Sequence, residues 1–384
     1  MNEVWIVATS MVTALGENRA ETWHRLLAGE SAINPIERFD TTPYYCKVAA
    51  EIRDLQLDHR TGSRLPTLLK KLFRDFPAPQ PSSCSLIGAT LKGAIDHQED
   101  IWRKEAVTLP QPYEAASLVA QHFGLKDPGI TINAACASST IALSTAASRI
   151  ASGSHDSIII WAAEILSEFV FAGFASLQAL TPDICRPFDE NRNGLALGEG
   201  AAALLLMSAQ QAIKEGRKPL AIIKGWGVAN DAVHLTAPAQ DGRGLIKACH
   251  RALNRAGLEA KKITAINAHG TGTIHNDNME IAAFKELFGQ YKVPFHSVKG
   301  ALGHTLGAAG AIETVIAIES LQKQLLPPTI GLKEPNKESA DLVSSEIQKF
   351  SDGHLLLTNS GFGGVNAALI LTQSQPSQIS ALQE

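Results

Sequence analysis

Short apolar runs rich in β-branched residues alternate along this chain with longer stretches in which apolar and polar positions recur at helical spacing. In the first half, the apolar runs predict strands at residues 4–8, 129–133, 157–161 and 201–207. The stretch 137–151 lies between two of these runs and predicts a helix. This alternation is typical of α/β proteins, whose sheets are covered by helices on both faces.

The second half of the chain repeats this arrangement. Its apolar runs predict strands at residues 220–224, 265–268, 295–297 and 355–358. Its longer stretches predict helices at residues 244–256, 278–287 and 307–321. A polar connector, KEGRKP, lies between the two series. We therefore predict two similar halves, residues 1–215 and 216–384.

The region 61–109 is the least regular part of the pattern. Three closely spaced prolines separate a basic helical segment at 68–76 from a later run at 86–102. Because proline lacks a backbone N–H and clashes with the preceding turn, prolines at this density exclude one continuous helix. The residues after Thr372 are expected to be frayed.

Composition and charge indicate a globular protein rather than one that binds membranes or nucleic acids. Of the 384 residues, 45% are hydrophobic and 19% are charged, and the formal net charge is −4. This charge provides no overall basic field for nucleic acid or an anionic membrane surface. The longest apolar runs are far shorter than the ~20 residues that a membrane span requires. The first residues predict a buried strand rather than a signal peptide, because they lack a positively charged segment.

The chain has five cysteines, an odd number, and none of them stands in a CxxC pair. This usage argues against a disulfide framework or a zinc site and predicts a cytoplasmic protein. Cys136 lies where a predicted strand passes into an Ala-rich predicted helix, in ITINAACASST. The positive end of a helix lowers the pKa of a thiol, so we expect an accessible thiolate there. The alternative is a cysteine that only packs beside this helix.

Two histidines lie in glycine-rich segments of the second half. His269 precedes the turn GTGT, whose hydroxyl groups can donate hydrogen bonds to a ligand. His304 opens a predicted helix within a Gly-Ala run, where small residues let the backbone approach a substrate closely. Each segment has a structural alternative, because His269 could cap its strand and the small residues around His304 could serve helix packing. His275, in the polar stretch after GTGT, is expected to lie in a solvated loop.

A charged pair and a glycine-rich turn complete the candidate chemistry. Lys299 and Glu313 lie on either side of His304 in the sequence, either as part of a site or as an ordinary ion pair. The turn NSGFGGVN joins two predicted strands near the C-terminus. No helix and no Lys-Ser/Thr pair follow it, so a phosphate-binding loop is poorly supported. The backbone N–H groups of its glycines could instead form an oxyanion site.

These four segments, in this order, resemble the β-ketoacyl-acyl carrier protein synthases of the type I/II kind, in the thiolase superfamily. The segment RPFDENRNGLALGEGAA and the opening VATSMVTALGENRAETWHRLLAGESAI are also similar to that family. The resemblance covers nearly the whole chain and is strongest from residue 129 onward. It implies an α/β protein with the thiolase fold, in which two similar halves form a five-layered α-β-α-β-α arrangement.

The resemblance implies a decarboxylative Claisen condensation. Cys136 would take an acyl group from a carrier-protein thioester, and the backbone amides of Cys136 and Phe362 would form the oxyanion hole. Malonyl-acyl carrier protein would then lose CO₂. His269 and His304 would donate hydrogen bonds to the resulting enolate as neutral imidazoles. The product would be a 3-oxoacyl-acyl carrier protein lengthened by two carbons.

The same resemblance implies roles for the residues around these three. Lys299 would orient His304 and supply a positive field, and Glu313 would be its acidic partner. The remaining matches are two hydroxyls that would hold the pantetheine arm, Thr271 and Thr273, and two acidic residues that would organise the loop behind the first histidine, Asp277 and Glu280. No cofactor and no catalytic metal are implied.

The implied partner is an acyl carrier protein in acyl- and malonyl-loaded forms. Because carrier proteins are acidic, a basic patch near the entrance is expected. Lys70, Lys71 and Arg74 lie together on a predicted helix and are candidates, although they could form only a solvated face. The chain is expected to form a homodimer, or a heterodimer with a related ketosynthase-like subunit that lacks the cysteine.

Two departures from the family favour a specialised fatty-acid, polyene (such as aryl polyene) or polyketide pathway over housekeeping fatty-acid elongation. The segment 58–110 is shorter than in ordinary synthases of this kind. The turn NSGFGGVN lacks one Phe before its first glycine, although Phe362 matches the remaining gating aromatic. Five apolar residues would pack near the acyl pocket, or would fill the core and the dimer seam: Leu166, Phe169, Val170, Phe171 and Phe174.

Three other functions compete with this interpretation. The chain could be the non-catalytic, chain-length-determining partner of a ketosynthase heterodimer, but the presence of Cys136, His269 and His304 argues against this role. Degradative thiolases and coenzyme A-dependent condensing enzymes have a second cysteine or a His-Asn pair where the two histidines stand here. A cysteine hydrolase would not account for the second histidine together with Lys299.

Overall fold

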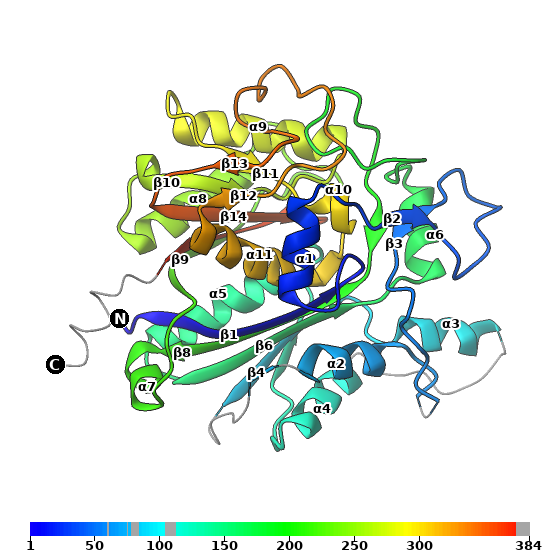
Figure 1. Cartoon of the computed structure of the whole chain (residues 1–384), viewed down its shortest axis with the longest axis horizontal. Coiled ribbons are helices and arrows are strands. Elements are labelled where there is room, and N and C mark those ends of the chain that lie inside the picture. The colour runs from blue at the N-terminus through cyan, green and yellow to red at the C-terminus, as the bar shows by residue number, and fades with distance from the viewer. Residues whose placement is uncertain (60, 75, 78–83, 104–112, 374–384) are drawn as a thin grey trace.

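The computed structural model describes residues 1–373 except for residues 60, 75, 78–83 and 104–112 (Figure 1). The elements of the first half are β1 (Val4–Thr13), α1 (Arg19–Leu27), β2 (Ile33–Pro35), β3 (Val48–Ala50), α2 (Leu65–Arg74), β4 (Ser85–Ala89), α3 (Ile95–Arg103), α4 (Tyr113–His122), β5 (Ile130–Ile132), α5 (Ser138–Ala151), β6 (Ser157–Glu164), α6 (Glu168–Ser176), β7 (Leu197–Gly198), β8 (Gly200–Ser208) and α7 (Ala209–Lys214).

The elements of the second half follow in the same alternating style. They are β9 (Ala221–Asn230), α8 (Arg243–Ala256), η1 (Ala260–Lys262), β10 (Ile263–Asn267), α9 (Ile274–Phe288), β11 (Phe295–His296), α10 (Lys299–Leu302), η2 (Leu306–Ala308), α11 (Ala309–Lys323), β12 (Leu325–Leu326), β13 (Gln348–Lys349), β14 (His354–Gly361) and β15 (Val365–Thr372), where η denotes a 3₁₀ helix.

Ten strands form one mixed sheet in the order β11-β10-β14-β15-β9-β1-β8-β6-β4-β5. Its two five-stranded sections meet where residues 4–6 of β1 pair with residues 221–223 of β9 in antiparallel register. Within each section, the central strands are rich in Ile, Leu, Val and Ala. All eight residues of β6, SIIIWAAE, are buried, as expected for a strand covered on both faces.

Helices cover both faces of the two sheet sections and produce five layers (Figure 1). Helices α8 and α9 lie outside the C-terminal section, and α2, α4 and α7 lie outside the N-terminal section. Helices α5 and α11 pack against each other between the two sections. The predicted α-β-α-β-α arrangement is therefore confirmed.

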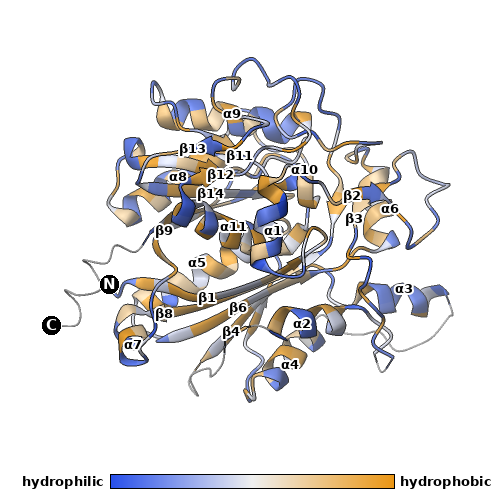
Figure 2. Cartoon of the chain, in the orientation of Figure 1, coloured by the Kyte–Doolittle hydropathy of each residue, from blue (hydrophilic) through white to orange (hydrophobic). Residues whose placement is uncertain are grey.

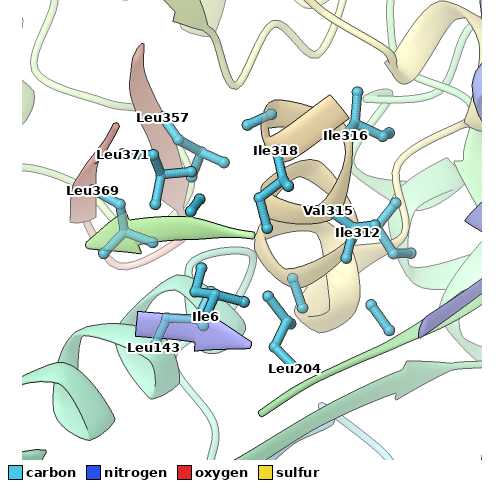
Figure 3. Close-up of a cluster of buried hydrophobic side chains, with 14 of the residues drawn as sticks. Ile6, Leu143, Leu204, Ile312, Val315, Ile316, Ile318, Leu357, Leu369 and Leu371 are labelled. Carbon is cyan, nitrogen blue, oxygen red and sulfur yellow. The ribbon is translucent and has the colours of Figure 1, made fainter. Parts of the chain in front are cut away.

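The apolar core is largest around the two central helices (Figure 3). Ile318 of α11 lies on the side of Leu357 and Leu371 of the C-terminal section, and Leu204 of the N-terminal section belongs to the same cluster. Residues 309–321 of α11 are all buried, which explains why this helix is apolar around its whole circumference. Outer helices such as α2 carry polar residues on their solvent side (Figure 2).

Most of the predicted elements are present, with boundaries shifted by a few residues. The run 86–102 contains most of β4 and most of α3. One further expectation requires correction, and another falls outside the described chain. His275 lies in the first turn of α9 rather than in a loop, although it is exposed as expected. The tail after residue 373 lies outside the described residues.

Candidate active site

Cys136 lies at a tight turn between β5 and α5, one residue before the helix N-cap, Ala137. The preceding residue, Ala135, has a φ of 48°, a left-handed conformation that is uncommon for a residue with a Cβ atom. The hydroxyl of Ser138 accepts from the Ala134 amide at 2.8 Å and donates to the Ala135 carbonyl at 2.6 Å. The predicted strand-to-helix position of the cysteine is confirmed, and this turn fixes it there.

The expectation of an accessible thiolate at Cys136 is wrong for this state of the protein. The residue is only 6% exposed, and burial raises the pKa of its thiol to about 12, because a low-dielectric environment disfavours the charged form. The positive charge of Lys299 acts in the opposite direction but does not overcome burial. The resting cysteine is therefore a thiol, and its proton must leave during nucleophilic attack.

Two histidines from the second half of the chain face this cysteine. The sulfur of Cys136 and one ring nitrogen each of His269 and His304 all lie within 4.8 Å of one another. The two imidazole rings meet edge to face, with centroids 5.2 Å apart. His269 follows β10, and His304 follows α10, so the fold joins three segments that are far apart in sequence.

The backbone of His304 is clamped on both sides by the segment around β7. Its amide donates to the Ala196 carbonyl at 2.7 Å, and its carbonyl accepts from the Gly198 amide at 3.0 Å. Within the described part of the chain, Nδ1 of His304 has no hydrogen-bond partner. Backbone contacts therefore determine the position of this histidine, rather than a polar partner for its ring.

Lys299 contacts the other histidine, which corrects the expectation that it orients His304. Its Nζ donates to the His269 carbonyl at 2.6 Å and lies 3.3 Å from His269 Nδ1. The same ammonium group forms a 2.5 Å ion pair with Glu313, and both side chains are almost fully buried. The expected pairing of Lys299 with Glu313 is thus present, and its positive charge lies behind His269.

Asn359, at the start of the NSGFGGVN turn, is a residue that the sequence analysis missed. Its Nδ2 donates to Glu313 Oε2 at 2.7 Å and lies 3.2 Å from His269 Nδ1, while its Oδ1 accepts from the Thr140 hydroxyl. Asn and Lys approach Nδ1 as donors, so Nδ1 of His269 is the acceptor. The ring proton consequently resides on Nε2, the nitrogen left free to donate to a ligand.

Both imidazoles are neutral at physiological pH. Burial lowers the pKa of His269 well below its usual value, and the charges of Lys299 and His304 lower it further. Burial and Lys299 lower the pKa of His304 in the same direction. Neutral imidazoles can donate a hydrogen bond, which is the role expected for the two histidines, and they can also accept a proton.

Asp277 and Glu280 hold the backbone of the loop that carries His269. Glu280 accepts from the His269 amide at 2.8 Å and from the Gly270 amide at 2.6 Å. Asp277 accepts from the Thr271 amide at 3.1 Å. Because these oxygens are occupied by backbone donors, the two carboxyl groups organise the loop, which agrees with the expectation for them.

A cavity of about 540 Å³ leads to these three residues. The hydroxyls of Thr271 and Thr273 lie 2.9 Å apart in its wall. Near Cys136, the ring of Phe362 stacks on Phe174 at a centroid distance of 5.6 Å. None of the described residues that line the cavity is a Lys, Arg, Asp or Glu. The cavity therefore suits an uncharged group.

Gly361 lies directly against the backbone of the nucleophile. A Cβ atom at this position would lie 3.0 Å from the Cys136 amide nitrogen and 3.1 Å from Cβ of Ala135. A side chain would therefore crowd the amide that was predicted to contribute to the oxyanion hole. This close approach explains why glycine stands immediately before Phe362, whose ring lines the same cavity.

Cys136, His269 and His304 also offer the types of atom that bind zinc. A metal held by this group would occupy the sulfur atom and remove it as a nucleophile. Lys299 lies directly behind His269, and its positive charge opposes a cation at this position. The donor set and its surroundings therefore fit nucleophilic chemistry better than a resident metal.

The candidate basic patch on α2 is partly neutralised. Lys71 forms ion pairs with Glu17, at 2.9 Å, and with Asp54, and Arg74 pairs with Glu17 at 3.5 Å. Lys70 is exposed. None of the three lines the cavity.

The fold and the site together define a thiolase-type acyltransferase. The profile of the "Beta-ketoacyl synthase, N-terminal domain" matches residues 1–66 and 87–212, and that of the "Beta-ketoacyl synthase, C-terminal domain" matches residues 220–333. The chain is 31% identical to "3-oxoacyl-[acyl-carrier-protein] synthase 2" of Coxiella burnetii over an alignment of 406 positions, which spans 96% of this chain and 98% of that protein. The chain belongs to the β-ketoacyl synthase family.

Solved structures of ketosynthase pairs are also similar. "The ishigamide ketosynthase/chain length factor" superposes with a TM-score of 0.86 at 28% identity, over 97% of this chain and all of that chain. The "Ketosynthase (ApeO) in Complex with its Chain Length Factor (ApeC)" from Xenorhabdus doucetiae gives a TM-score of 0.83 at 27% identity, over 97% and 98%. Within the described residues, no helix is long and apolar enough to cross a membrane.

Proposed function

We propose that the protein catalyses decarboxylative Claisen condensation of an acyl group held on Cys136 with malonyl-acyl carrier protein. The observation that carries this proposal is the convergence of the cysteine sulfur and two neutral imidazoles within 4.8 Å, at the end of an uncharged cavity. A hydrolase needs one base beside its nucleophile, whereas condensation needs a second donor for an enolate oxygen. His269 and His304 together meet this requirement.

In the first half-reaction, the Cys136 sulfur attacks the thioester carbonyl of an acyl-carrier protein. The thiol proton passes to a neighbouring neutral imidazole and then to the departing carrier thiol. Negative charge develops on the carbonyl oxygen, and the amides of Cys136 and Phe362 are the donors that we assign to it. The acyl-cysteine that results keeps the activated character of a thioester.

In the second half-reaction, the C–C bond to the malonyl carboxylate breaks and CO₂ leaves. The electron pair forms an enolate whose oxygen accepts hydrogen bonds from Nε2–H of His269 and from His304. Lys299 lowers the energy of this negative charge from behind His269. The enolate carbon attacks the acyl-cysteine, the sulfur leaves as a thiolate that takes up a proton from solvent, and the 3-oxoacyl chain is two carbons longer on the carrier protein.

The uncharged lining of the cavity supports a neutral pantetheine arm as its occupant. Thr271 and Thr273 supply hydroxyl groups along the wall, and Phe174 and Phe362 supply apolar surface close to the sulfur. We assign the two threonines to the amide groups of the arm. We also propose that the chain divides at residue 215, because the nucleophile lies in the first half and both histidines lie in the second half.

The proposed reaction also bears on the biosynthetic pathway and on the quaternary structure of the protein. We infer a specialised fatty-acid, polyene or polyketide synthase, which the similarity to the ishigamide and ApeO–ApeC ketosynthases supports. A homodimer or a heterodimer with a ketosynthase-like subunit would fit this assignment. The chain itself would be the catalytic subunit, because it contains Cys136 and both histidines. A cytoplasmic location is part of the same proposal.

The test uses purified protein, a panel of acyl-carrier proteins of increasing chain length, and malonyl-carrier protein. Mass spectrometry of the carrier should show a 3-oxoacyl product two carbons longer than the primer, with one CO₂ released for each product. The Cys136→Ala variant should give no product and should keep malonyl decarboxylation. Condensation by that variant would contradict the proposal. Native mass spectrometry with candidate partner subunits distinguishes a homodimer from a heterodimer.

A further inference from the structure

Glu164 is a buried carboxyl group close to the nucleophile that the reaction described above does not use. It ends β6 and is only 3% exposed. Its Oε1 accepts from the Leu91 amide at 2.5 Å, and further hydrogen bonds come from the Thr90 hydroxyl and the Gly307 amide. When ionised, this carboxyl group would raise the pKa of the Cys136 thiol, which places it within electrostatic reach of the site.

These hydrogen bonds join three separate segments. Glu164 belongs to the end of β6, Leu91 lies in the loop after β4, and Gly307 lies in the turn η2. The contact with Gly307 is close, because a Cβ atom there would lie only 2.7 Å from Glu164 Oε1 and 3.3 Å from the Leu91 side chain. One carboxyl group therefore fixes the distance between the first half of the chain and the turn η2.

The turn that Glu164 holds begins immediately after His304 and is strained. Leu306, two residues after the histidine, has a φ of 48°, a left-handed conformation that is unfavourable for a residue with a Cβ atom. Such a conformation persists only when its surroundings impose it. The histidine ring has no polar partner on Nδ1 among the described residues, so its position depends on the backbone on either side. Glu164 supplies the anchor on the C-terminal side.

A neutral carboxyl group suits this position. Burial raises the pKa of Glu164 to about 8, although hydrogen bonds from Leu91 and Gly307 and the charge of Lys92 lower it. The group is therefore mainly protonated at pH 7. An ionised carboxylate so close to Cys136 would oppose both loss of the thiol proton and formation of an enolate. As a neutral acid, it can still accept hydrogen bonds from the two amides.

We propose that Glu164 is a positioning residue for the condensation step, which holds the turn after His304 so that the imidazole faces the enolate oxygen. This inference rests on the proposed function, because it assigns a task to His304. The proposal predicts that replacing Glu164 slows one of the two half-reactions more than the other. Acylation of Cys136 does not require an enolate, so it should depend on Glu164 much less than malonyl decarboxylation does.

The experiment compares two rates in Glu164→Ala and Glu164→Gln. One is acylation of Cys136 by an acyl-carrier protein, followed by intact mass, and the other is CO₂ release from malonyl-carrier protein. In Glu164→Ala, decarboxylation should fall by roughly 10- to 100-fold, as expected for a displaced catalytic group, while acylation changes by less than about threefold. Glu164→Gln keeps an acceptor oxygen for the two amides and should restore most of the decarboxylation rate at pH 7.

A pH profile separates positioning from simple loss of stability. Wild-type decarboxylation should decline relative to that of Glu164→Gln as the pH rises through about 8, because only glutamate gains a charge there. Lys92 and Cys136 are the other titratable groups in electrostatic contact with this carboxyl group. The wild-type protein and Glu164→Gln both retain these two groups, so their own titration affects both proteins in the comparison. A ratio that stays constant from pH 7 to pH 9 would overturn the assignment of a neutral carboxyl group.

Two further variants keep the test decisive. Gly307→Ala leaves Glu164 intact but pushes the turn away from it, and it should reproduce the selective loss even if Glu164→Ala does not fold. Glu319→Ala, which removes a buried carboxyl group of α11 that pairs with Arg19, should leave the ratio of the two rates unchanged. Equal losses of acylation and decarboxylation, or normal decarboxylation in Gly307→Ala, would refute the inference. Absence of condensation by the wild-type protein would instead refute the proposed function.

Discussion

The side-chain amide of Asn359 lies 3.2 Å from Nδ1 of His269 and thereby determines which nitrogen of that imidazole carries the proton. Its amide orientation is itself determined, because Oδ1 accepts from Thr140 and Nδ2 donates to Glu313. The chain of contacts runs from α5 through β14 to the histidine. A single asparagine thus links the helix behind the nucleophile to the histidine that we propose binds the enolate.

Replacing Asn359 by alanine should lower malonyl decarboxylation by roughly 10- to 100-fold, equivalent to about 1.5–3 kcal/mol for a lost hydrogen bond to a buried group. Lys299 would still contact Nδ1, so the effect should be partial. The measurement is the rate of CO₂ release under saturating malonyl-carrier protein. Acylation of Cys136, which needs no enolate donor, is the internal control. An unchanged rate of CO₂ release would show that Lys299 alone orients the ring.

Replacing Lys299 by methionine should destabilise the fold by about 3–5 kcal/mol, because Glu313 would remain buried without its cation. Denaturant-induced unfolding measures this loss. The double variant Lys299→Met/Glu313→Gln should recover part of it, since no unpaired charge remains. As a matched control, Lys292→Met removes the exposed pair with Asp341 and should leave the free energy of unfolding nearly unchanged, because solvent screens this pair. Equal losses in the two lysine variants would contradict the buried-pair account.

Much of this architecture was predictable because the signals were local. The strand at Gly200–Ser208 and the helix at Ser138–Ala151 follow directly from their apolar runs, and the strand-to-helix position of Cys136 follows from both patterns. The pairing of β1 with β9, which joins the two sheet sections, depends on contacts between residues more than 200 positions apart. No local periodicity reports such contacts.

The candidate site was likewise predictable only in part. The three central residues could be chosen from their sequence segments, but the partner of Lys299 could not, because His269 and His304 are both plausible from spacing. Asn359 was overlooked since a polar residue before a glycine-rich turn is ordinary turn composition. The only available signal was its apolar strand context, which implies burial and therefore a hydrogen-bond partner. The pKa of Cys136 was misjudged because the helix terminus was considered without burial.

The raised pKa of Cys136 predicts its reactivity toward alkylating reagents. Because the pKa is about 12, the thiolate fraction should rise about tenfold per pH unit between pH 7 and pH 10. The rate of carbamidomethylation at this residue, followed by peptide mass spectrometry, should rise in parallel without a plateau. The rate in Lys299→Met should be lower at each pH, since Lys299 favours the thiolate. A plateau near pH 8.5 would indicate an ordinary exposed cysteine.

Gly361 provides a steric test of the oxyanion hole. Its replacement by alanine places a methyl group 3.0 Å from the Cys136 amide nitrogen, so acylation of the cysteine should slow by at least tenfold. Rates of acyl adduct formation by intact mass measure this effect. Gly173→Ala on α6, where an added Cβ meets nothing within 4 Å, is the matched control and should acylate at the wild-type rate. Normal acylation of Gly361→Ala would exclude the Cys136 amide from the hole.

The central claim is that Cys136 passes its acyl group to a decarboxylated malonyl unit, and a single-turnover chase tests it most directly. The protein is acylated with a ¹³C-labelled acyl-carrier protein, freed of excess donor, and mixed with unlabelled malonyl-carrier protein. We predict that the label leaves Cys136 and appears in a 3-oxoacyl-carrier protein, with one CO₂ per chain transferred. Release of the label as a free carboxylic acid, or its retention on Cys136 while CO₂ is formed, would contradict the claim.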